Sequence, residues 1–468
     1  MKSLFGLVLL ASHLMGQTSG SWRSVDWKKE QAEVLAHYRS LIRIDTSNPP
    51  GNETKAVEYL KKVLEGAGIP TQTFSNDPSR ANLVARISGN GSKRPLLIMA
   101  HTDVVGVQRE KWPVDPFGAV IQDGYVWGRG SIDDKDKLTA NLMTMLLLKR
   151  HQAQLDRDVI FLAEAGEEGT TQVGITFMVE KHLEAINAEF AITEGGGAVI
   201  RDGKVVFMNI GCTEKVPRAT RLVVNGTSGH GSVPREDNAL VHLSAALAKV
   251  GTWETPMRLN DTTRAYFERL AGISTPEAAA RYNGLLDPAK SDTSQAYLRK
   301  NEPNRYSMLR TSVVPTIIKG GFRVNVIPSE AEATLDVRAL PDEDMAKFYD
   351  EMRKVIGDPA VKIEAIPGNM RPAGKPSRLD TDLFRALEAT AKKMYPGVTV
   401  LPTMSTGASD MAQLRAAGIP SYGIGPANLE SDSLKYGAHS DVERLAEASL
   451  YRFVEFVWSA VTDVAGSK

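Results

Sequence analysis

Hydrophobic residues recur along the first 200 positions in two patterns that alternate. Amphipathic helical spacing is found at residues 27–41, 53–66, 137–149 and 174–183. Short runs rich in apolar and β-branched residues, typical of strands, are found at residues 82–87, 95–100, 159–163 and 190–192. The second of these runs is almost wholly apolar, as expected of a central strand that is buried on both faces. Strands that alternate with helices predict an α/β fold in which helices cover both faces of a mixed sheet.

The pattern changes near Lys215. Residues 218–225 alternate polar and apolar side chains, which indicates a strand with one face in water. The other elements predicted for this region are a helix at 238–250, strands at 322–326 and 331–340, a helix at 343–356 and a strand at 361–366. Together they have the β-α-β-β-α-β order of a compact α+β unit. Residues 252–310 are polar and irregular, and we interpret them as an extra insertion within this unit.

The alternation of helices and apolar strands found in the first 200 residues resumes towards the carboxyl terminus. They are a helix at 379–394, strands at 398–402 and 421–424, and a last helix at about 442–461. With 468 residues, the chain also exceeds the usual size of one domain. We therefore expect a main domain made of residues 22–214 and 369–468, and an α+β domain, residues 215–368, that is inserted into it.

Composition and charge indicate which classes of protein the chain can belong to. The 56 basic and 56 acidic residues balance to zero net charge, which gives no support to binding of nucleic acid or anionic membranes. Lys2 followed by the mostly apolar residues 4–11 predicts a signal peptide within residues 1–20, and hence export to the periplasm or out of the cell; the alternative is an uncleaved anchor. This run is too short to span a bilayer, and no other run approaches the necessary ~18 residues. Cys212, the only cysteine, is interpreted as a buried small apolar residue and not as a nucleophile.

Five short clusters of metal-type ligands are the most informative feature of the chain. They are His101 with Asp103, Asp133 with Asp134, Glu167 with Glu168, Glu194 alone, and His439 with Asp441. Each of the first four follows an apolar or β-branched run, which places them at strand ends, where α/β proteins build their sites. Two histidines, several carboxylates and no cysteine suit zinc or a similar divalent ion. There are too many carboxylates for one tetrahedral zinc, so the set indicates two metals that share a carboxylate.

Spacing within the clusters suggests a division of roles. His101 and Asp103 point the same way from extended backbone, so Asp103 can accept a hydrogen bond from the ring nitrogen that His101 does not use for a metal. Glu168 can bind metal while Glu167 moves protons. The ordinary alternatives are a histidine in a strand-end turn, helix capping by Asp133 or Asp134, and an exposed acidic turn at 167–168.

His230 lies among glycines, in Gly-His-Gly-Ser-Val-Pro at 229–234, near the start of the inserted domain. A histidine in such a segment is either an ordinary loop residue or a group that reaches over the site and binds a developing oxyanion. The sequence pattern leaves both interpretations open.

As a set, the motifs resemble those of one enzyme family. They are His-x-Asp at 101–103, Gly-Arg-Gly-x-x-Asp-Asp-Lys at 128–135, Glu-Glu at 167–168, Glu-Gly at 194–195, the His230 motif and the late His439. This order resembles the di-zinc amidohydrolases of metallopeptidase family twenty, which include aminoacylase, acetylornithine deacetylase, succinyl-diaminopimelate desuccinylase, carnosinase and bacterial glutamate carboxypeptidase. The resemblance covers residues 30–460. It is closest to the secreted N-acyl-amino-acid hydrolase and carboxypeptidase S subgroup, through Arg310-Thr-Ser-Val and Asn325-Val-Ile-Pro, although Asp136 stands where many relatives carry glycine.

The resemblance implies a fold and a role for each residue. The main domain would be a mixed-sheet zinc-peptidase catalytic domain, and the inserted domain a lid that also dimerises. One Zn²⁺ would be bound by His101, Asp133 and Glu194, and the other by Asp133, Glu168 and His439, with Co²⁺ or Mn²⁺ as substitutes. Glu167 would be the general base, with Asp103 and His230 as the other catalytic residues, and His230 would often come from the partner subunit of a dimer. Asn325 and Arg338 would hold a substrate carboxylate, residues 406–410 would form a substrate loop, and the Asp133–Asp134 peptide would be cis.

The function implied by the resemblance is zinc-dependent hydrolysis of an amide bond next to a free carboxylate. An N-acyl-amino-acid amidohydrolase and a carboxypeptidase both fit this description, and the substrates would be small N-acyl amino acids or short peptides. The alternatives within the family are a dipeptidase and a small-acyl deacetylase. A more remote alternative is a metal-binding protein that has kept the fold without the activity.

Overall fold

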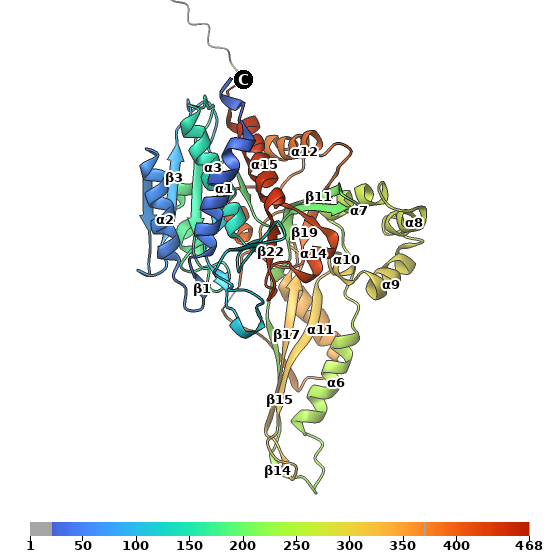
Figure 1. The fold of residues 1–468 in the computed structure, drawn as a ribbon. Coiled ribbons are helices and arrows are strands. Elements are labelled where there is room, and N and C mark those ends of the chain that lie inside the picture. Colours follow the sequence, from blue (N-terminus) through green and yellow to red (C-terminus); the bar gives the residue numbers. More distant parts are fainter. Residues whose placement is uncertain (1–20, 369, 468) are drawn as a thin grey trace, which may run out of the picture.

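The structure of the protein is a computed structural model that describes residues 21–368 and 370–467 (Figure 1). The predicted signal peptide, residues 1–20, lies outside the described residues. None of the helices within the described ranges is long and apolar enough to cross a membrane. The larger part of the molecule is built on one large sheet, and a narrow second unit projects from it (Figure 1).

A ten-stranded sheet forms the centre of the larger part. In spatial order its strands are β2 (Thr71–Phe74), β3 (Asn82–Ile87), β8 (Val159–Glu164), β4 (Leu96–His101), β9 (Phe190–Thr193), β20 (Ser421–Gly423), β11 (Lys204–Glu214), β10 (Gly197–Arg201) and β21 (Ala427–Leu429), and β19 (Thr399–Ser405) also pairs with β11. The strands β8, β4, β9 and β20 are parallel neighbours, whereas β3 runs antiparallel to β8 and β20 antiparallel to β11. The prediction of a mixed sheet is therefore confirmed.

Helices cover both faces of this sheet, as predicted. One face carries α1 (Trp27–Ile42), α2 (Glu53–Gly66), α3 (Lys135–Arg150), α12 (Asp382–Met394) and α15 (Glu447–Ala465), and the other carries α4 (Ile175–Lys181), α5 (Leu183–Ile186) and α13 (Met411–Ala416). Along β4, Leu96, Ile98 and Ala100 pack in the first core, and Leu97 and Met99 pack in the second. Successive side chains of a strand point to opposite faces, so a wholly apolar run supplies both cores at once.

The projecting unit, which we call the lid, has its own five-stranded sheet. Its strands are β12 (Val216–Pro217), β13 (Thr220–Asn225), β15 (Ser312–Gly320), β17 (Glu330–Ala339) and β18 (Val361–Ala365), and the helices on it are α6 (Ala239–Thr252) and α11 (Met345–Ile356). Leu222 and Val224, alternate residues of β13, point into the lid core, as the alternating pattern predicts. A short antiparallel pair of strands, β14 (Gly229–His230) and β16 (Val326–Ile327), lies at the tip of the lid, far from the large sheet (Figure 1).

Residues 252–310 do not form the irregular insertion that the sequence predicts. They contain the helices α7 (Asp261–Ala271), α8 (Pro276–Gly284), α9 (Ser291–Asn301) and α10 (Pro303–Ser307). Phe267 and Leu270 of α7 pack with Leu401 and Met404 of β19, so this segment covers the large sheet instead of extending the lid. The prediction was wrong because the exposed faces of these helices are polar, which weakens the apolar periodicity. One local signal was present, since Asn260 forms a capping box at the start of α7.

The strand predicted at residues 322–326 is also wrong, and β10 and β11 were not predicted at all. The lid strand lies earlier, at β15, and the apolar residues that suggested the later position are in water: Phe322 is 84% exposed and Val324 is 100% exposed. Pro315 obscured the strand, because it lies where the pairing of β15 with β17 shifts register. Proline is confined to edges and bulges of sheets, and β15 pairs only with β17 among the described strands.

Lys215 lies where the chain passes from the large sheet into the lid, and it is fully buried. Its ammonium group donates a hydrogen bond to the hydroxyl of Ser312 at 2.7 Å, and others to the hydroxyl and the carbonyl of Ser307 at 3.1 Å. Burial lowers the pKa of Lys215 to about 7, and the nearby Arg338 acts in the same direction. One buried amine therefore joins β11, the end of α10 and the start of β15.

We expect Lys215 to make the stability of the protein depend on pH. Between a pKa of about 7 in the folded chain and about 10.4 in unfolded chains, only the unfolded state holds this proton, so stability rises with pH. Relative to Lys215→Met, the wild type should gain free energy of unfolding in urea as the pH rises from about 7 to about 10. Lys347→Met, at a side chain that is 85% exposed, is the control and should follow the wild type. A difference between wild type and Lys215→Met that stays constant over this range would contradict the prediction.

Candidate active site

The predicted ligands gather at one edge of the large sheet. The strands β4, β8 and β9 are parallel neighbours, so their carboxyl ends lie side by side. His101 ends β4, Glu194 directly follows β9, and Glu167 and Glu168 follow β8 after a short turn. The carboxyl ends of parallel strands are where open α/β sheets place their sites.

Asp133, in the turn before α3, lies between the two histidines. Its Oδ1 atom is 2.9 Å from Nε2 of His101, and its Oδ2 atom is 3.2 Å from Nε2 of His439. The same Nε2 of His439 is 2.9 Å from Oε1 of Glu168, and Nε2 of His101 is 4.0 Å from Oε2 of Glu194. Two groups of ligand atoms result, one around each histidine, and Asp133 belongs to both.

Asp134 also lies near the His101 group, but its oxygens have other partners. Its Oδ2 atom accepts the backbone N–H of His101 at 3.2 Å, and its Oδ1 atom is 2.7 Å from Nζ of Lys137. The side chain makes no capping hydrogen bond to α3, so helix capping does not explain this residue. The Asp133–Asp134 peptide is cis, as the resemblance implies.

The cluster holds more negative charge than the nearby cations balance. Hydrogen bonds from His439 to Asp133 and Glu168 raise the pKa of His439 to about 10. Burial, followed by the carboxylates of Glu167 and Asp133, raises the pKa of Glu194 well above its usual value. Such a set stabilises positive charge at its centre, whether protons or divalent cations. Because the donors are imidazole nitrogens and carboxylate oxygens, they fit a pair of ions such as Zn²⁺, Co²⁺ or Mn²⁺.

Asp103 supports the turn that carries both glutamates. Its carboxylate, fully buried, accepts the backbone N–H groups of Glu167 and Glu168, both at 3.1 Å. The ring of His101 is nearer to the backbone carbonyl of Asp103, at 3.0 Å from Nδ1, than to its carboxylate, at 3.4 Å. The predicted pairing with His101 is therefore shared between the carbonyl and the side chain, and the carboxylate also holds the turn of Glu167.

Glu443 supports the turn that carries Asp133, and no motif had indicated it. Its fully buried carboxylate accepts a hydrogen bond from Nη1 of Arg129 at 2.7 Å. It also accepts the backbone N–H groups of Gly130 and Ile132, at 3.2 and 2.8 Å. A signal was available, since an arginine between two glycines beside a site needs a carboxylate partner, and Glu443 follows His439 by four positions.

Glu167 faces a guanidinium that no motif in the sequence indicates. Nη2 of Arg371 is 2.7 Å from Oε1 of Glu167, and Nη1 of Arg371 pairs with Asp410. Burial and then the carboxylate of Asp410 raise the pKa of Glu167 to about 8, while Arg371 opposes the rise. Arg371 lies in the segment by which the chain returns from the lid to the large sheet, so only the fold brings it to the site.

The lid contributes one wall of the cleft above the ligands. This cleft has a volume of about 360 Å³, and its lining includes Pro217 and Arg338 from the lid together with Glu167 and Arg371. Of the predicted carboxylate-binding pair, Arg338 is therefore at the site. Asn325 and His230 are not in this lining: both are exposed, His230 in β14 and Asn325 directly before β16.

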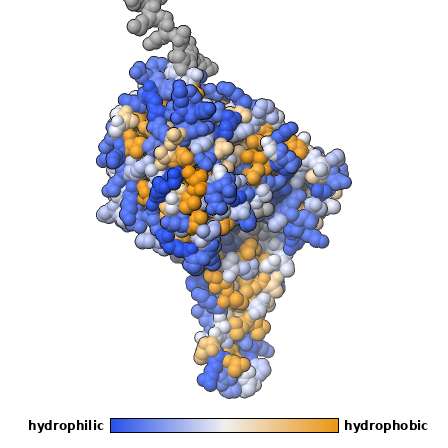
Figure 2. Space-filling view, viewed as in Figure 1, coloured by the Kyte–Doolittle hydropathy of each residue, from blue (hydrophilic) through white to orange (hydrophobic). Residues whose placement is uncertain are grey.

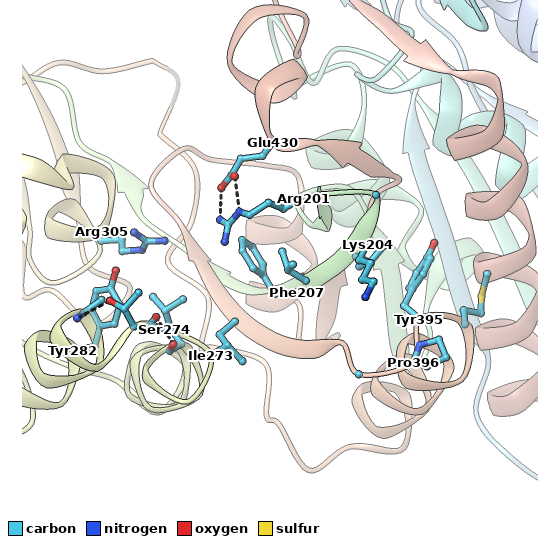
Figure 3. Close-up of a pocket in the computed structure, with 18 of the residues that line it drawn as sticks. Arg201, Lys204, Phe207, Ile273, Ser274, Tyr282, Arg305, Tyr395, Pro396 and Glu430 are labelled. Carbon is cyan, nitrogen blue, oxygen red and sulfur yellow. Dashed lines mark hydrogen bonds and ion pairs between the residues drawn. The ribbon is translucent and has the colours of Figure 1, made fainter.

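Another cavity lies away from the predicted ligands. It has a volume of about 920 Å³ and is bounded by α7, α8, the β10–β11 hairpin and the end of α12 (Figure 3). In its walls, Arg201 donates two hydrogen bonds to Glu430, at 2.8 and 2.6 Å, and Arg305 pairs with Glu302 at 2.5 Å. None of the predicted metal ligands lines it, so we assign it no part in the chemistry.

The comparisons with known proteins agree with this geometry. Residues 97–463 match the family described as Peptidase family M20/M25/M40. The chain belongs to this family. Human N-fatty-acyl-amino acid synthase/hydrolase PM20D1 is 25% identical over 93% of this chain and 89% of the relative. Aminoacylase-1B of Rattus norvegicus is 27% identical over 93% of this chain and 96% of the relative.

A solved structure shows the same fold as this M20 peptidase. It is the M20 family metallo-carboxypeptidase Sso-CP2 from Sulfolobus solfataricus, with a TM-score of 0.69 and 20% sequence identity over 92% of this chain and 99% of that chain. Membership in the family makes the protein a hydrolase of amide bonds, which confirms the predicted class of enzyme. The two groups of ligand atoms are candidate metal sites in keeping with a metallopeptidase family.

Proposed function

We propose that this M20 peptidase uses two Zn²⁺ ions to hydrolyse the amide bond of a small N-acyl amino acid or short peptide whose carboxylate is free. The observation that carries the proposal is the convergence, in one cleft, of two ligand groups that share Asp133, the carboxylate of Glu167 and the guanidinium of Arg338. The other proposed ligands are His101, Glu168, Glu194 and His439. The names of the relatives, one for N-fatty-acyl amino acids and one for a carboxypeptidase, agree with this substrate class.

Glu167 is the residue placed to move the proton. Two bound zinc ions would supply activation of water and polarisation of the scissile carbonyl. Its carboxylate lines the cleft beside both ligand groups and belongs to neither, so it can accept a proton without losing a metal contact. Glu167 then passes the proton to the nitrogen of the leaving amine, and the same side chain serves both halves of the reaction.

Arg338 would recognise the free carboxylate of the substrate. Its guanidinium lines the same cleft as Glu167, on the side formed by the lid, and is about one-third exposed (34%). A planar guanidinium binds a carboxylate through two parallel hydrogen bonds. A substrate with an amidated carboxyl group would lose the charge on which this interaction depends.

The experiment that tests the function follows release of free amine by the purified protein with added zinc. The substrates are N-acetyl, N-succinyl and long-chain N-acyl amino acids and dipeptides, each with its carboxylate free or amidated. We expect turnover of free-carboxylate substrates only, and Arg338→Lys should raise their KM roughly 10-fold because lysine cannot form the bidentate contact. Arg353→Lys, at a side chain that is 56% exposed on α11, is the matched control and should leave KM unchanged.

The outcomes separate the candidate activities. Preference for dipeptides would identify a dipeptidase, and preference for N-acetyl or N-succinyl substrates a small-acyl deacetylase. Equal turnover of free and amidated substrates would overturn the role of Arg338. No turnover by a protein with two bound metals would favour the metal-binding alternative over the enzyme.

We also propose that the protein is a homodimer through the lid. The strand β15 has a free edge among the described strands, and its residues Val314, Ile317 and Ile318 are 52%, 50% and 59% exposed. Figure 2 shows hydrophobic residues gathered along the lid, in contrast to the mostly hydrophilic larger part. An apolar open edge invites pairing with another chain, and a second copy would cover it. The lid tip with His230 and Asn325 would then be free to complete the partner's site.

Complementation between two inactive variants tests this assembly. Glu167→Ala and His230→Ala should each be nearly inactive alone. Co-expressed in equal amounts, they should recover about a quarter of wild-type activity, because half of the dimers are mixed and each mixed dimer has one intact site. No recovery, or a monomeric mass by sedimentation, would contradict the shared site.

We propose, finally, that the protein is exported. The support is the leader pattern at residues 1–20, Lys2 followed by a mostly apolar run, which lies outside the described residues. Mass spectrometry of the chain recovered from the periplasm or the medium should show a mature start between Gly16 and Ser21. Recovery of the full-length chain in the membrane fraction would instead indicate an uncleaved anchor.

A further inference from the structure

The turn at residues 46–51 lies against the active site, and nothing above gives it a role. Its strand β1 (Ser47–Asn48) pairs in parallel with β5 (Val104–Val105), directly after Asp103. The hydroxyl of Thr46 donates to the carbonyl of Thr102 at 2.6 Å, directly before Asp103. The turn is therefore fixed to the chain on both sides of Asp103.

Asn48 reaches the carboxylate that supports the catalytic turn. Its Nδ2 atom donates to Oδ2 of Asp103 at 2.8 Å, and the two residues are 8% and 0% exposed. The amide must present its NH₂ group here, because an ionised carboxylate can only accept. The same carboxylate accepts the backbone N–H of Glu167 at Oδ1 and that of Glu168 at Oδ2. Asn48 therefore fixes the rotation of the group on which the backbone of both glutamates rests.

Packing gives a second, independent observation. Gly169 follows Glu168 and lines the cleft. A Cβ atom at Gly169 would lie 2.3 Å from Nδ2 and 2.6 Å from Oδ1 of Asn48, closer than real Cβ contacts occur. The side chain of Asn48 is thus held between the carboxylate of Asp103 and the bare backbone of Gly169. Asn48 therefore contacts the turn of Glu167 and Glu168 directly, at Gly169, as well as through Asp103.

We propose that Asn48 is a positioning residue for hydrolysis, which orients Asp103 so that Glu167 is set for proton transfer and Glu168 for metal binding. This inference rests on the roles proposed above for Glu167 and Glu168. Asn48 is not in the lining of the cleft, so it acts through Asp103 and not on the substrate. Partners of this kind typically change metal affinity or activity 10- to 100-fold when they are replaced. We expect a loss of about this size in kcat and in zinc affinity, with KM nearly unchanged because Arg338 is untouched.

Two substitutions distinguish orientation from space filling. Asn48→Ala removes the donor and leaves a gap. Asn48→Asp keeps the size and shape but turns a second carboxylate towards Asp103, and two adjacent carboxylates repel. If Asn48 orients Asp103, activity falls from Asn to Ala to Asp. If Asn48 only fills space, Asp at this position should behave like Asn.

The experiment measures kcat and KM for the best substrate of the panel, and zinc affinity by competition with a chromophoric chelator. Asn52→Ala is the matched control, because Asn52 follows the same turn and its side chain makes no capping hydrogen bond. In an Asp103→Asn background, the effect of Asn48→Ala should largely disappear, since the two residues would act through one contact. Wild-type kcat and zinc affinity in Asn48→Asp would overturn the inference.

The same data separate this inference from the proposed function. If wild type and Asn52→Ala fail to turn over every member of the panel, the proposed activity is wrong. Zinc competition still tests the positioning role in that case, since it needs no substrate. If wild type is active and the Asn48 variants equal it in kcat and zinc affinity, only the positioning role is lost.

Discussion

Replacing Glu167 by alanine or glutamine should reduce kcat by about 10²- to 10⁴-fold, the range by which general acid–base groups accelerate reactions. The carboxylate of Glu167 is not among the ligand atoms of either group, and its backbone N–H stays hydrogen-bonded to Asp103 whatever the side chain. The substitution should therefore remove the proton carrier without removing a metal ligand. Arg371 would also lose one of its two carboxylate partners, but Asp410 remains.

The measurement combines turnover with metal content. Plasma emission should find two zinc ions per chain in wild type and in Glu167→Gln alike. Glu184→Gln, at a side chain that is 79% exposed, is the control for loss of a carboxylate and should keep wild-type activity. Normal turnover by Glu167→Ala would contradict the assignment of Glu167 as the general base. A single bound ion per chain would instead support a one-metal structural site with solvated carboxylates around it.

Replacing Glu443 by glutamine should destabilise the folded protein by about 3–5 kcal/mol, as expected when one partner of a buried ion pair is removed. Arg129 is 2% exposed and would keep its charge without a carboxylate partner. Burial raises the pKa of Glu443 above its usual value, but Arg129 and the backbone N–H of Ile132 oppose this effect and stabilise its charged form. Because Gly130 and Ile132 lead into Asp133, the variant should also bind zinc less tightly.

An exposed pair of the same chemistry provides the control. Arg201 and Glu430 form two hydrogen bonds with each other, but their side chains are 53% and 51% exposed. Glu430→Gln should change the free energy of unfolding by no more than about 1 kcal/mol, because water screens exposed ion pairs. Urea denaturation of both variants without added metal gives the comparison. Equal effects of the two substitutions would show that Glu443 is not the buried support that its contacts indicate.

Several strands of the large sheet could be predicted because their pattern is local. The run at residues 95–100 predicts a strand buried on both faces, and β4 supplies alternate residues to two separate cores. The strand at 322–326 failed for the opposite reason. Phe322 and Val324 are apolar residues of an exposed turn, while Pro315 interrupts the pattern of the real strand. Local apolarity identifies a strand only where the fold buries it.

The candidate site divides in the same way. The clusters of metal-type side chains were found from residue type and, for the first four, from their position at predicted strand ends, and the resemblance to the family implied the role of each residue. The residues that support these side chains could not be predicted in this way. Glu443 pairs with Arg129, which is 314 positions away in the sequence, and Arg371 pairs with Glu167, which is 204 positions away. Neither pairing produces a periodic pattern in the sequence, because each depends on how the fold brings distant segments together.

By itself, the sequence determined six strands of the large sheet, β3, β4, β8, β9, β19 and β20, the set of metal-type side chains and the family to which they point. These features depend on the type of each residue and on its neighbours a few positions away, and both can be read from the sequence. Only the tertiary structure decided that Asp133 stands between both histidines, that Asn48 supports the turn of Glu167, and that Arg338 reaches the cleft while His230 does not. Each of these depends on the packing of segments far apart in sequence, and a contact of that kind has no local pattern from which it can be predicted.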